Sequence, residues 1–496
     1  MRAAALGHYR DNNDYKTMSQ TKANSAVDVT SPSRNQSAIP LNQKIAFGIG
    51  MLANQMFPAA LGVFMIVLIK GLGMSPLLWG LIFFLPKLID AVTDPLMGYI
   101  SDHTDSRWGK RRPYVFIGAI IAGCSYMIMW QVYESNSEFY NFIYFLGWSC
   151  VFWIGMTIFG VPFVAMGYEM SDDFHERTRI MAVSQWIGQW AWVIVPWFWV
   201  ILDPQFGWFD SMSEGARSLS LWVGAGCMIL ALVPAIFCTH KPNLDSNQKQ
   251  GDKRSLTESM KDFGRGIVVT LQNKPFQKIC IATFFIFNAF NIVASFSYFI
   301  ITDYVKAGPN WVAAYGSVSA LCTTFLVIPI INRLSQIYGK KITFLCSQAI
   351  SLLGYILLWW GFSPENPWLM FLPLPLFACG IGGLFTLMMS MTADICDLDE
   401  LETSQRREGT FGAIYWWMVK FGGAFGGLAT GAILYYIGYS GDAQEHTERT
   451  LDLLRLSYII VPCIGTLIAI FVMRNYDLDE QRANEIRTQL EARHTQ

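Results

Sequence analysis

Charged residues are scarce in this chain of 496 residues. Asp, Glu, Lys and Arg make up 15% of it, whereas soluble proteins carry about 25%, and apolar residues make up 53%. The 36 basic residues nearly balance the 37 acidic ones, and no basic stripe is present, so a nucleic-acid partner is not expected. The composition is typical of an integral membrane protein.

Paired cysteines and a signal peptide are also missing. The ten cysteines are scattered through mostly apolar runs without a CxxC pair, which argues against a disulfide framework and a zinc site. Residues 1–40 are rich in Ser, Asn and Thr and lack the apolar core of a signal peptide. We expect them to form a disordered cytoplasmic tail.

Long apolar runs dominate the rest of the chain, and a membrane span needs roughly 20 such residues. The chain is therefore expected to be all-α, with twelve spans, at about 45–70, 77–101, 114–133, 140–168, 180–202, 218–238, 277–304, 311–332, 342–361, 367–392, 411–437 and 455–473. The longest connection, 239–276, divides them six and six, which predicts an N-terminal half (41–238), a linker (239–276), a C-terminal half (277–474) and a C-terminal cytoplasmic tail (475–496).

Basic residues are concentrated in alternate loops. The rich loops hold Arg107, Lys110, Arg111, Arg112, Arg177, Arg179, Lys249, Lys253, Arg254, Lys261, Arg333, Lys340, Lys341, Arg406 and Arg407. Because such loops stay in the cytoplasm, both termini are predicted to be cytoplasmic, in a multi-pass protein of the cell inner membrane.

The linker contains a predicted amphipathic helix. Ser255-Leu-Thr-Glu258 resembles a capping box, and apolar residues follow at helical spacing: Leu256, Met260, Phe263, Ile267 and Leu271. The helix either lies on the inner membrane surface or simply joins the two halves.

A weak internal repeat relates the two halves. Residues 102–112 and 332–341 each place Gly-Lys at the same distance after a polar residue at the end of a span. This indicates duplicated halves, as parallel repeats in transporters do. In the eleventh span, glycines at small-xxx-small spacing predict close helix packing: Gly422, Gly423, Gly426, Gly427 and Gly431.

Two aspartates, Asp90 and Asp94, lie within the second span. A spacing of four puts both carboxylates on one helix face. An ionised carboxylate in hydrocarbon costs at least ~2.5 kcal/mol, so such residues usually mark an ion or substrate path. They could bind Na⁺, which prefers oxygen ligands, share a proton, or form a salt bridge with Lys87 or Lys420 without any ion.

Two long motifs resemble the glycoside–pentoside–hexuronide:cation symporters, the melibiose-permease-like branch of the major facilitator superfamily. The first is Asp90-Ala-Val-Thr-Asp94-Pro-Leu-Met-Gly98, followed by Asp102 and Arg107-Trp-Gly-Lys-Arg-Arg-Pro113. The second is Ala393-Asp394-Ile-Cys-Asp397, followed by Glu400, Thr403, Arg406, Glu408 and Gly409-Thr410. The resemblance covers residues 41–474.

This resemblance implies twelve helices in two six-helix bundles, the major facilitator fold, with a central sugar site and a cation site between spans two, four and eleven. The implied cation-site residues are Asp90, Asp94, Thr93, Thr157 and Lys420, with Asp90 and Asp94 as the Na⁺ carboxylates. Lys420 is expected either to balance the charge of the empty site or to compete with the cation.

The sugar site departs from the melibiose-type pattern. Charged positions of that pattern are occupied here by Asn54, Gln55, Gly160 and Gln185, so its sugar specificity is not carried over. Amides can bind sugar hydroxyls, and an aromatic ring can stack on a pyranose, although packing is the simpler role for a tryptophan. The substrate-site candidates are Asn54, Gln55, Gln185, Gln189, Trp190 and Phe385.

A set of charged loop residues is expected to form an inner gate. It comprises Asp102, Arg107, Arg111, Arg112, Asp397 and Arg406, with Asp172, Asp173, Glu176 and Glu400 as further acidic partners. Ion pairs of this kind are weak enough to break, as a gate requires. The basic residues could instead act only as topology signals.

The sequence thus predicts a secondary active transporter that imports a glycoside or oligosaccharide with Na⁺ or H⁺ by alternating access. A cation-coupled carrier of lysolipids or other amphiphiles is the alternative, and a membrane-embedded transferase is a remote one. We expect a monomer in a lipid bilayer, with a sugar substrate, no nucleic-acid partner, and no cofactor besides the coupling ion.

Overall fold

The computed structural model describes residues 39–104, 106–171, 174–238, 256–403, 407–441, 446–478 and 480–494. Leu41–Gln496 form one compact unit. Every regular element among the described residues is a helix. The predicted N-terminal tail up to residue 38, the linker up to Ser255, and Arg406 lie outside the described residues.

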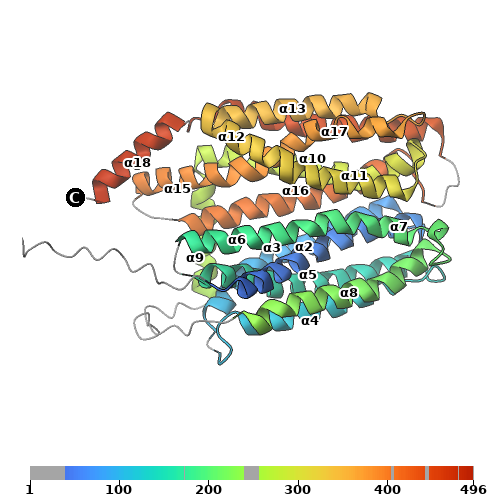
Figure 1. The fold of residues 1–496 in the computed structure, drawn as a ribbon, viewed down its shortest axis with the longest axis horizontal. Helices are drawn as coiled ribbons and strands as arrows, with labels where there is room; N and C mark the ends of the chain where they lie inside the picture. The colour runs from blue at the N-terminus through green and yellow to red at the C-terminus, as the bar shows by residue number, and fades with distance from the viewer. Residues whose placement is uncertain are drawn as a thin grey trace, which may run out of the picture. The chain divides into compact units, whose positions relative to one another are not determined.

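Eleven helices in the described part of the chain are long and apolar enough to cross a membrane. They lie side by side along one axis (Figure 1). They are α2 (Leu41–Lys70), α3 (Pro76–Asp102), α4 (Arg112–Met129), α5 (Glu138–Glu169), α8 (Met212–Phe237), α10 with η3 (Lys274–Tyr304), α11 with η4 and α12 (Pro309–Tyr338), α13 (Lys340–Gly361), η5 through α15 (Pro367–Thr403), α16 (Glu408–Tyr436) and α17 (Glu448–Arg474).

The fifth predicted span, 180–202, is interrupted. It folds as α6 (Phe174–Ile194), η1 (Val195–Trp197) and α7 (Phe198–Leu202), which follow one another along the bundle (Figure 1). Pro196 lacks a backbone N–H, which accounts for the break, and α6 begins with the charged residues Glu176, Arg177 and Arg179. Length and composition alone therefore identify eleven of the twelve predicted spans.

The helices pack mainly within two sets, which we call the first half (α2–α8) and the second half (α10–α17). In the first half, α4 packs against α5 and α8, and α2 packs against α6 and α8. In the second half, α10 packs against α16 and α17, and α13 packs against α14 (Leu374–Gly383) and α17. The halves meet where α3 packs against α16 and α6 against α11 (Pro309–Leu321). The boundaries of the two predicted bundles stay a prediction.

Glycines allow α16 to approach both of its neighbours closely. A Cβ on Gly431 would lie 2.3 Å from the Pro76 carbonyl oxygen of α3, and one on Gly422 would lie 2.7 Å from the Phe284 carbonyl oxygen of α10. No side chain fits at either position without a shift of backbone, so the glycines hold α16 between α3 and α10.

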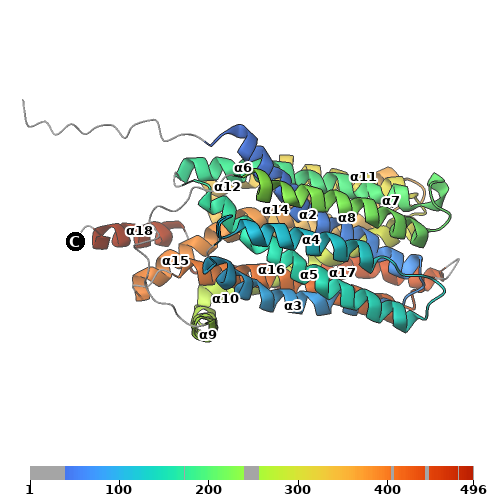
Figure 2. The same ribbon diagram turned by 90° about the horizontal axis from the view of Figure 1, so that it is seen from below.

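Two further helices lie at the end of the bundle that carries the C-terminus. Figure 2 shows α9 (Leu256–Leu271) nearly end-on, so it lies across the long axis of the bundle. The predicted tail 475–496 contains α18 (Glu480–His494), which packs against α15 (Met389–Thr403). Its buried residues Ala483, Ile486 and Leu490 recur at helical spacing, which explains why this segment is helical.

Candidate ion and substrate site

The centre of the bundle holds an ion-pair cluster between α3 and α16. Lys420 Nζ lies 2.7 Å from Asp90 Oδ2 and also forms an ion pair with Asp94. Asp90 is buried, whereas the side chains of Asp94 and Lys420 are 23% and 29% exposed. One ammonium therefore bridges two carboxylates one helical turn apart.

Thr157 of α5 connects this cluster to a third helix. Its hydroxyl lies 2.6 Å from Asp90 Oδ1 and 3.3 Å from Asp94 Oδ1, and since it has one hydrogen, the shorter contact receives it. Thr93 Oγ1 lies 3.2 Å from Thr157 Oγ1 and 3.2 Å from the Asp90 carbonyl oxygen. The structure thus brings together all five residues that the family resemblance assigns to a cation site.

The cluster offers oxygen ligands of two kinds, carboxylate and hydroxyl. Such a set suits a hard ion. No group of three or more His, Cys, Asp and Glu residues suited to a metal occurs in the described ranges. The ammonium of Lys420 already contacts the carboxylate oxygens that an ion would use, so the two cations would compete.

Lys87 is not the partner of Asp90, although the two residues are three apart on one helix. Lys87 Nζ lies 5.5 Å from the centroid of the Phe83 ring and 6.0 Å from that of Trp153 in α5. Of the described residues, none forms an ion pair with it. The alternative of a Lys87–Asp90 salt bridge is therefore wrong for this structure.

Two of the predicted substrate amides contact each other across α2 and α6. Gln55 Nε2 donates to Gln185 Oε1 at 3.1 Å, and Trp192 Nε1 donates to Gln55 Oε1 at 2.8 Å. The sequence analysis missed Trp192. It follows Gln185 by seven residues, two helical turns, and that spacing would have placed both on one face of α6.

The remaining substrate candidates are more dispersed. Asn54 Oδ1 lies 3.2 Å from the position of a Cβ on Gly160, so two of the four positions that are charged in the melibiose-type pattern are neighbours. Trp190 is 39% exposed, with its ring centroid 6.1 Å from that of Trp186, and Gln189 is partly exposed. Phe385 lies in the π-helical turn η6 (Leu384–Met388) and packs edge-on against Phe287 of α10.

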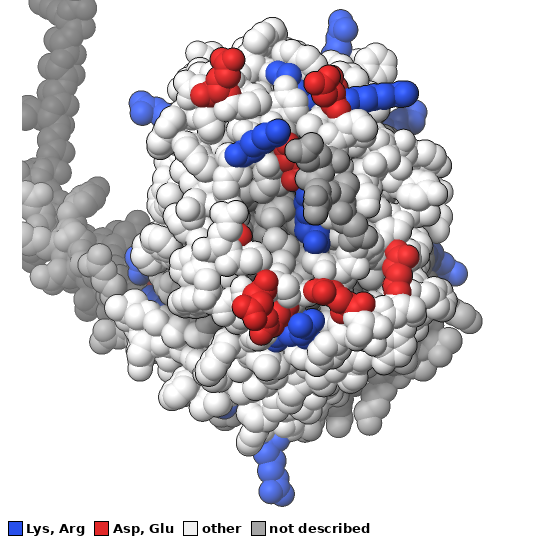
Figure 3. Space-filling view, turned by 90° about the vertical axis from the view of Figure 1, so that its right-hand side faces the viewer, with Lys and Arg blue, Asp and Glu red and all other residues white. Residues whose placement is uncertain are grey.

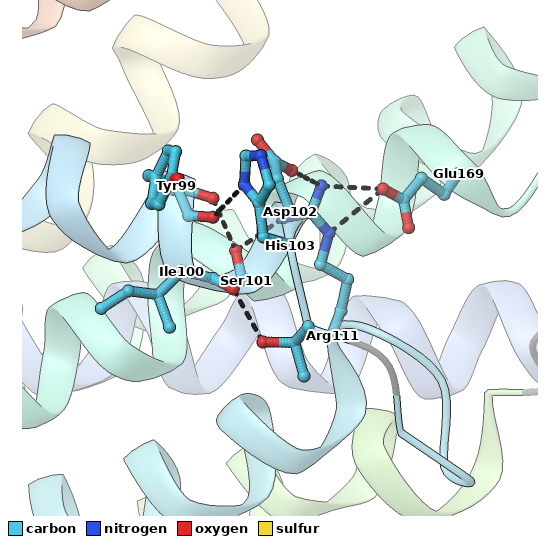
Figure 4. Close-up of polar contacts among 9 residues, drawn as sticks. Tyr99, Ile100, Ser101, Asp102, His103, Arg111 and Glu169 are labelled. Carbon is cyan, nitrogen blue, oxygen red and sulfur yellow. Dashed lines mark hydrogen bonds and ion pairs between the residues drawn. The ribbon is translucent and has the colours of Figure 1, made fainter. Parts of the chain in front are cut away.

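At the predicted cytoplasmic end, Arg111 lies between two carboxylates of its own half (Figure 4). It forms an ion pair with Asp102, donates from Nε and Nη2 to Glu169 Oε1 at 3.1 and 2.8 Å, and donates to Ser101 Oγ at 2.6 Å. Burial opposes the charged form, but the hydrogen bonds and charges of Glu169 and Asp102 outweigh it and raise the pKa of Arg111.

The other predicted gate residues have different surroundings. Arg112 donates to the carbonyl oxygens of Ala235 and Ile236 at the end of α8, and Arg107 is exposed. Asp397 lies on α15, while Arg406, Asp172 and Asp173 lie outside the described residues. Arg111 pairs with Asp102 of the predicted gate and also with Glu169 at the end of α5, which was not among the predicted partners, and the gate itself stays a prediction.

Other ion pairs at this end also join residues of the same half. Lys44 pairs with Glu176 at 2.6 Å in the first half, and Lys340 pairs with Asp394 at 2.6 Å in the second. Arg407 pairs with Asp399.

At the opposite, predicted outer end, an ion pair joins the two halves. Lys70 Nζ, at the end of α2, lies 2.9 and 2.8 Å from the Asp303 carboxylate oxygens in η3 (Ile300–Tyr304). The Tyr439 hydroxyl donates to the same carboxylate, and the His446 ring stacks on Tyr439 with centroids 4.3 Å apart. We call these four residues the outer cluster. Figure 3 shows this end as a largely uncharged face with scattered charged side chains.

The known proteins that this chain is similar to are membrane transporters. Residues 46–480 match the family described as MFS/sugar transport protein. The chain is 25% identical to "Uncharacterized symporter YnaJ" of Bacillus subtilis, covering 93% of this chain and 97% of that one. It is 22% identical to the "Isoprimeverose transporter" of Lactiplantibacillus pentosus, with 96% and 97% covered. Among solved structures, the nucleoside transporter NupG is similar, with a TM-score of 0.63 at 15% identity, covering 88% of this chain and 100% of that one.

Proposed function

Because the chain belongs to the family of MFS/sugar transport proteins, as a multi-pass membrane transporter and not an enzyme, we propose that it imports a glycoside or oligosaccharide together with Na⁺. Relatives that match over most of its length carry the names of symporters and of a transporter of the sugar isoprimeverose. These names support a cation-coupled sugar transporter, while the choice of Na⁺ rests on the site itself.

The bridge from Lys420 to Asp90 and Asp94 is the observation that carries this proposal. A cation bound to the two carboxylates would displace the ammonium of Lys420 and so change the contact between α3 and α16, where the two halves meet. Binding of the ion is thereby linked to the geometry between the halves, and this coupling must be reciprocal with substrate binding. Four side-chain carboxylate oxygens and neighbouring hydroxyls favour Na⁺, and H⁺ is the second choice.

We infer alternating access from the contact between the two halves. The Lys70–Asp303 pair joins the halves at the predicted outer end. We assign this arrangement to the state closed toward the outside, with both termini in the cytoplasm. The halves would then rock around the central cluster to expose it to the other side.

Uptake of a glycan panel into membrane vesicles, with and without Na⁺, tests the proposal. Asp90→Asn and Asp94→Asn should each abolish Na⁺-dependent accumulation, because each removes a charged ligand. Asp210→Asn is the matched control, because Asp210 is an exposed residue of a loop at the predicted outer end. Accumulation that persists in both site variants refutes the cation assignment, and uptake competed by lysolipids but not by sugars refutes the sugar.

A further inference from the structure

Two arginines occupy equivalent places in the two halves. Arg217 lies near the start of α8 and Arg455 near the start of α17, and each of these helices is the last span of its half. Each packs against the third span of the same half, α8 against α4 and α17 against α13 (Figure 1). At about 1.5 Å per residue, the two arginines lie about 8 and 11 Å inside the start of their helices. Both are therefore placed close to the predicted outer surface of the membrane.

Both guanidinium groups contact the outer end of the third span in the same way. Arg217 Nη1 donates to the Val132 carbonyl oxygen at 2.9 Å, and Arg217 Cζ lies 4.7 Å from the centroid of the Tyr133 ring. Arg455 Nη2 donates to the Trp359 carbonyl oxygen, and Arg455 Cζ lies 4.0 Å from the centroid of the Trp359 ring. The same cation, backbone acceptor and aromatic ring thus recur in both halves, so the arrangement is not an accident of one loop.

Neither guanidinium has a carboxylate partner in the part of the chain that the structure describes. Glu214 and Asp452 each precede the arginine of their helix by three residues, a spacing that favours an ion pair, yet neither forms one in the structure. Arg455 also donates to the Tyr304 hydroxyl, but its Nε is buried without a hydrogen-bond partner among the described residues. Because a guanidinium has five N–H groups, each arginine keeps donors for a further ligand. An unpaired cation at a membrane boundary calls for an anion.

The surfaces around the two arginines are those of a lipid contact. On α8, Leu221 and Trp222 follow the arginine and are exposed, as are Leu456 on α17 and Trp360 at the end of α13. Exposed apolar residues continue along the same four helices toward the middle of the membrane: Ile117, Ile120, Ile229, Leu353, Ile356, Ile460 and Ile464. Aromatic side chains concentrate where a membrane meets water. A cation beside aromatic rings, above an apolar helix surface, matches a phospholipid, whose phosphate lies above its acyl chains.

We propose that each half binds the phosphate of one phospholipid in the leaflet at the predicted outer end, through Arg217 in the first half and Arg455 in the second. A guanidinium binds phosphate strongly because its N–H groups match the phosphate oxygens in pairs. A free phosphate ion would have to lose water beside exposed apolar side chains, whereas a lipid carries its phosphate to this depth. The bound lipids would stabilise the contact between the third and the last span of each half. These sites are separate from the central ion-pair cluster and go beyond the proposed transport.

Lipids with the same acyl chains, with and without a phosphate, test the ligand. The full chain is purified in a polyoxyethylene detergent, bound lipids are counted by native mass spectrometry, and the unfolding temperature is measured. Dioleoylphosphatidylglycerol should remain bound as at least two molecules per chain and raise the unfolding temperature, whereas dioleoylglycerol should do neither. Equal binding of the two lipids overturns the inference. Inorganic phosphate that raises the unfolding temperature as much as the phospholipid also overturns it, because the ligand would then be a free ion.

Substitution of the arginines separates lipid binding from a structural role. Arg217→Gln and Arg455→Gln each keep a donor for the carbonyl oxygen of the third span but remove the charge. Each should weaken the binding of one phosphatidylglycerol about 10-fold or more, because hydrogen bonds to a charged group are lost, and the double variant should weaken two. Arg217→Lys and Arg455→Lys should retain binding, and Arg449→Gln, at an exposed position of α17, is the matched control. If the Gln variants bind phosphatidylglycerol as tightly as this control, the arginines are only structural and the inference is wrong. The comparison of the two lipids on the wild-type chain decides the question if the Gln variants fail to fold.

Discussion

Lys70 and Asp303, 233 residues apart, form an ion pair that joins the two halves at one end of the bundle. Both side chains are mostly buried, at 18% and 14% exposed. The Tyr439 hydroxyl donates to the same carboxylate, so several donors in the outer cluster depend on Asp303. This end of the molecule is therefore sensitive to the loss of a single negative charge.

Asp303→Asn should shift the protein toward a state open at the predicted outer end. A hydrogen bond to a charged group contributes about 1.5–3 kcal/mol, so the equilibrium should move about 10- to 150-fold. Spin labels on Gln205→Cys and Lys306→Cys in a background without other cysteines report the opening as a longer distance. Asp210→Asn should leave the distance unchanged, and the exchanged pair Lys70→Asp with Asp303→Lys should restore it. An unchanged distance distribution in Asp303→Asn contradicts the role of the outer cluster.

The outer cluster should also lose stability in acid through His446. Burial lowers the pKa of His446, the nearby Asp303 opposes this shift, and Lys70 reinforces it. A pKa below the ordinary value of about 6.5 means that the folded protein favours the neutral ring, so this stability is complete above about pH 6.5 and is lost as the pH falls below it. The unfolding temperature should therefore drop more between pH 7.5 and 5.5 in the wild type than in His446→Gln. Equal drops in both proteins would show that His446 does not contribute.

Lys420→Met should make the stability of the protein depend strongly on Na⁺. Loss of one partner of a buried ion pair costs about 3–5 kcal/mol, because Asp90 and Asp94 then repel each other without a counter-charge. Na⁺ should restore much of this, and its effect on the unfolding temperature should exceed that in the wild type, while Lys420→Arg should resemble the wild type. Recovery at low pH but not with Na⁺ would identify H⁺ as the bound ion instead.

Gly431→Ala should destabilise the contact between α3 and α16. The added Cβ would lie 2.3 Å from the Pro76 carbonyl oxygen and 2.8 Å from Gly80 Cα, and such overpacking costs about 1–3 kcal/mol. Gly147→Ala is the matched control, because nothing lies within 4 Å of its Cβ, and it should be neutral or stabilising by about 0.5–1 kcal/mol. Thermal unfolding of the two variants measures the difference, and a Gly431→Ala protein as stable as the control would refute this close contact.

Local patterns predicted several parts of the site correctly. The spacing of Asp90 and Asp94 placed both carboxylates on one helix face, and the family resemblance named Lys420 as one residue of the same site. The glycines of α16 predicted close packing, because glycine leaves the helix backbone accessible. Such features can be predicted from the sequence because they depend on the helical period of a single segment or on a motif shared with a family.

Local spacing could not predict which residues pair when they are far apart in the sequence. Lys87 and Asp90 have a spacing that favours a pair on an isolated helix, yet Asp90 pairs with Lys420 of another helix. Likewise, Arg111 pairs with Glu169, and Trp192 donates to Gln55. Each contact joins residues far apart in the sequence, so the spacing of residues within one helix does not indicate it.

The sequence by itself determined that this is an α-helical membrane protein with two carboxylates in its interior, because apolar run length and the cost of buried charge are properties of single segments. Only the tertiary structure decided which lysine neutralises those carboxylates and which remains unpaired among the described residues. That choice depends on the packing of α3 against α16, which Gly427 and Gly431 allow and which brings residues 326 positions apart into contact.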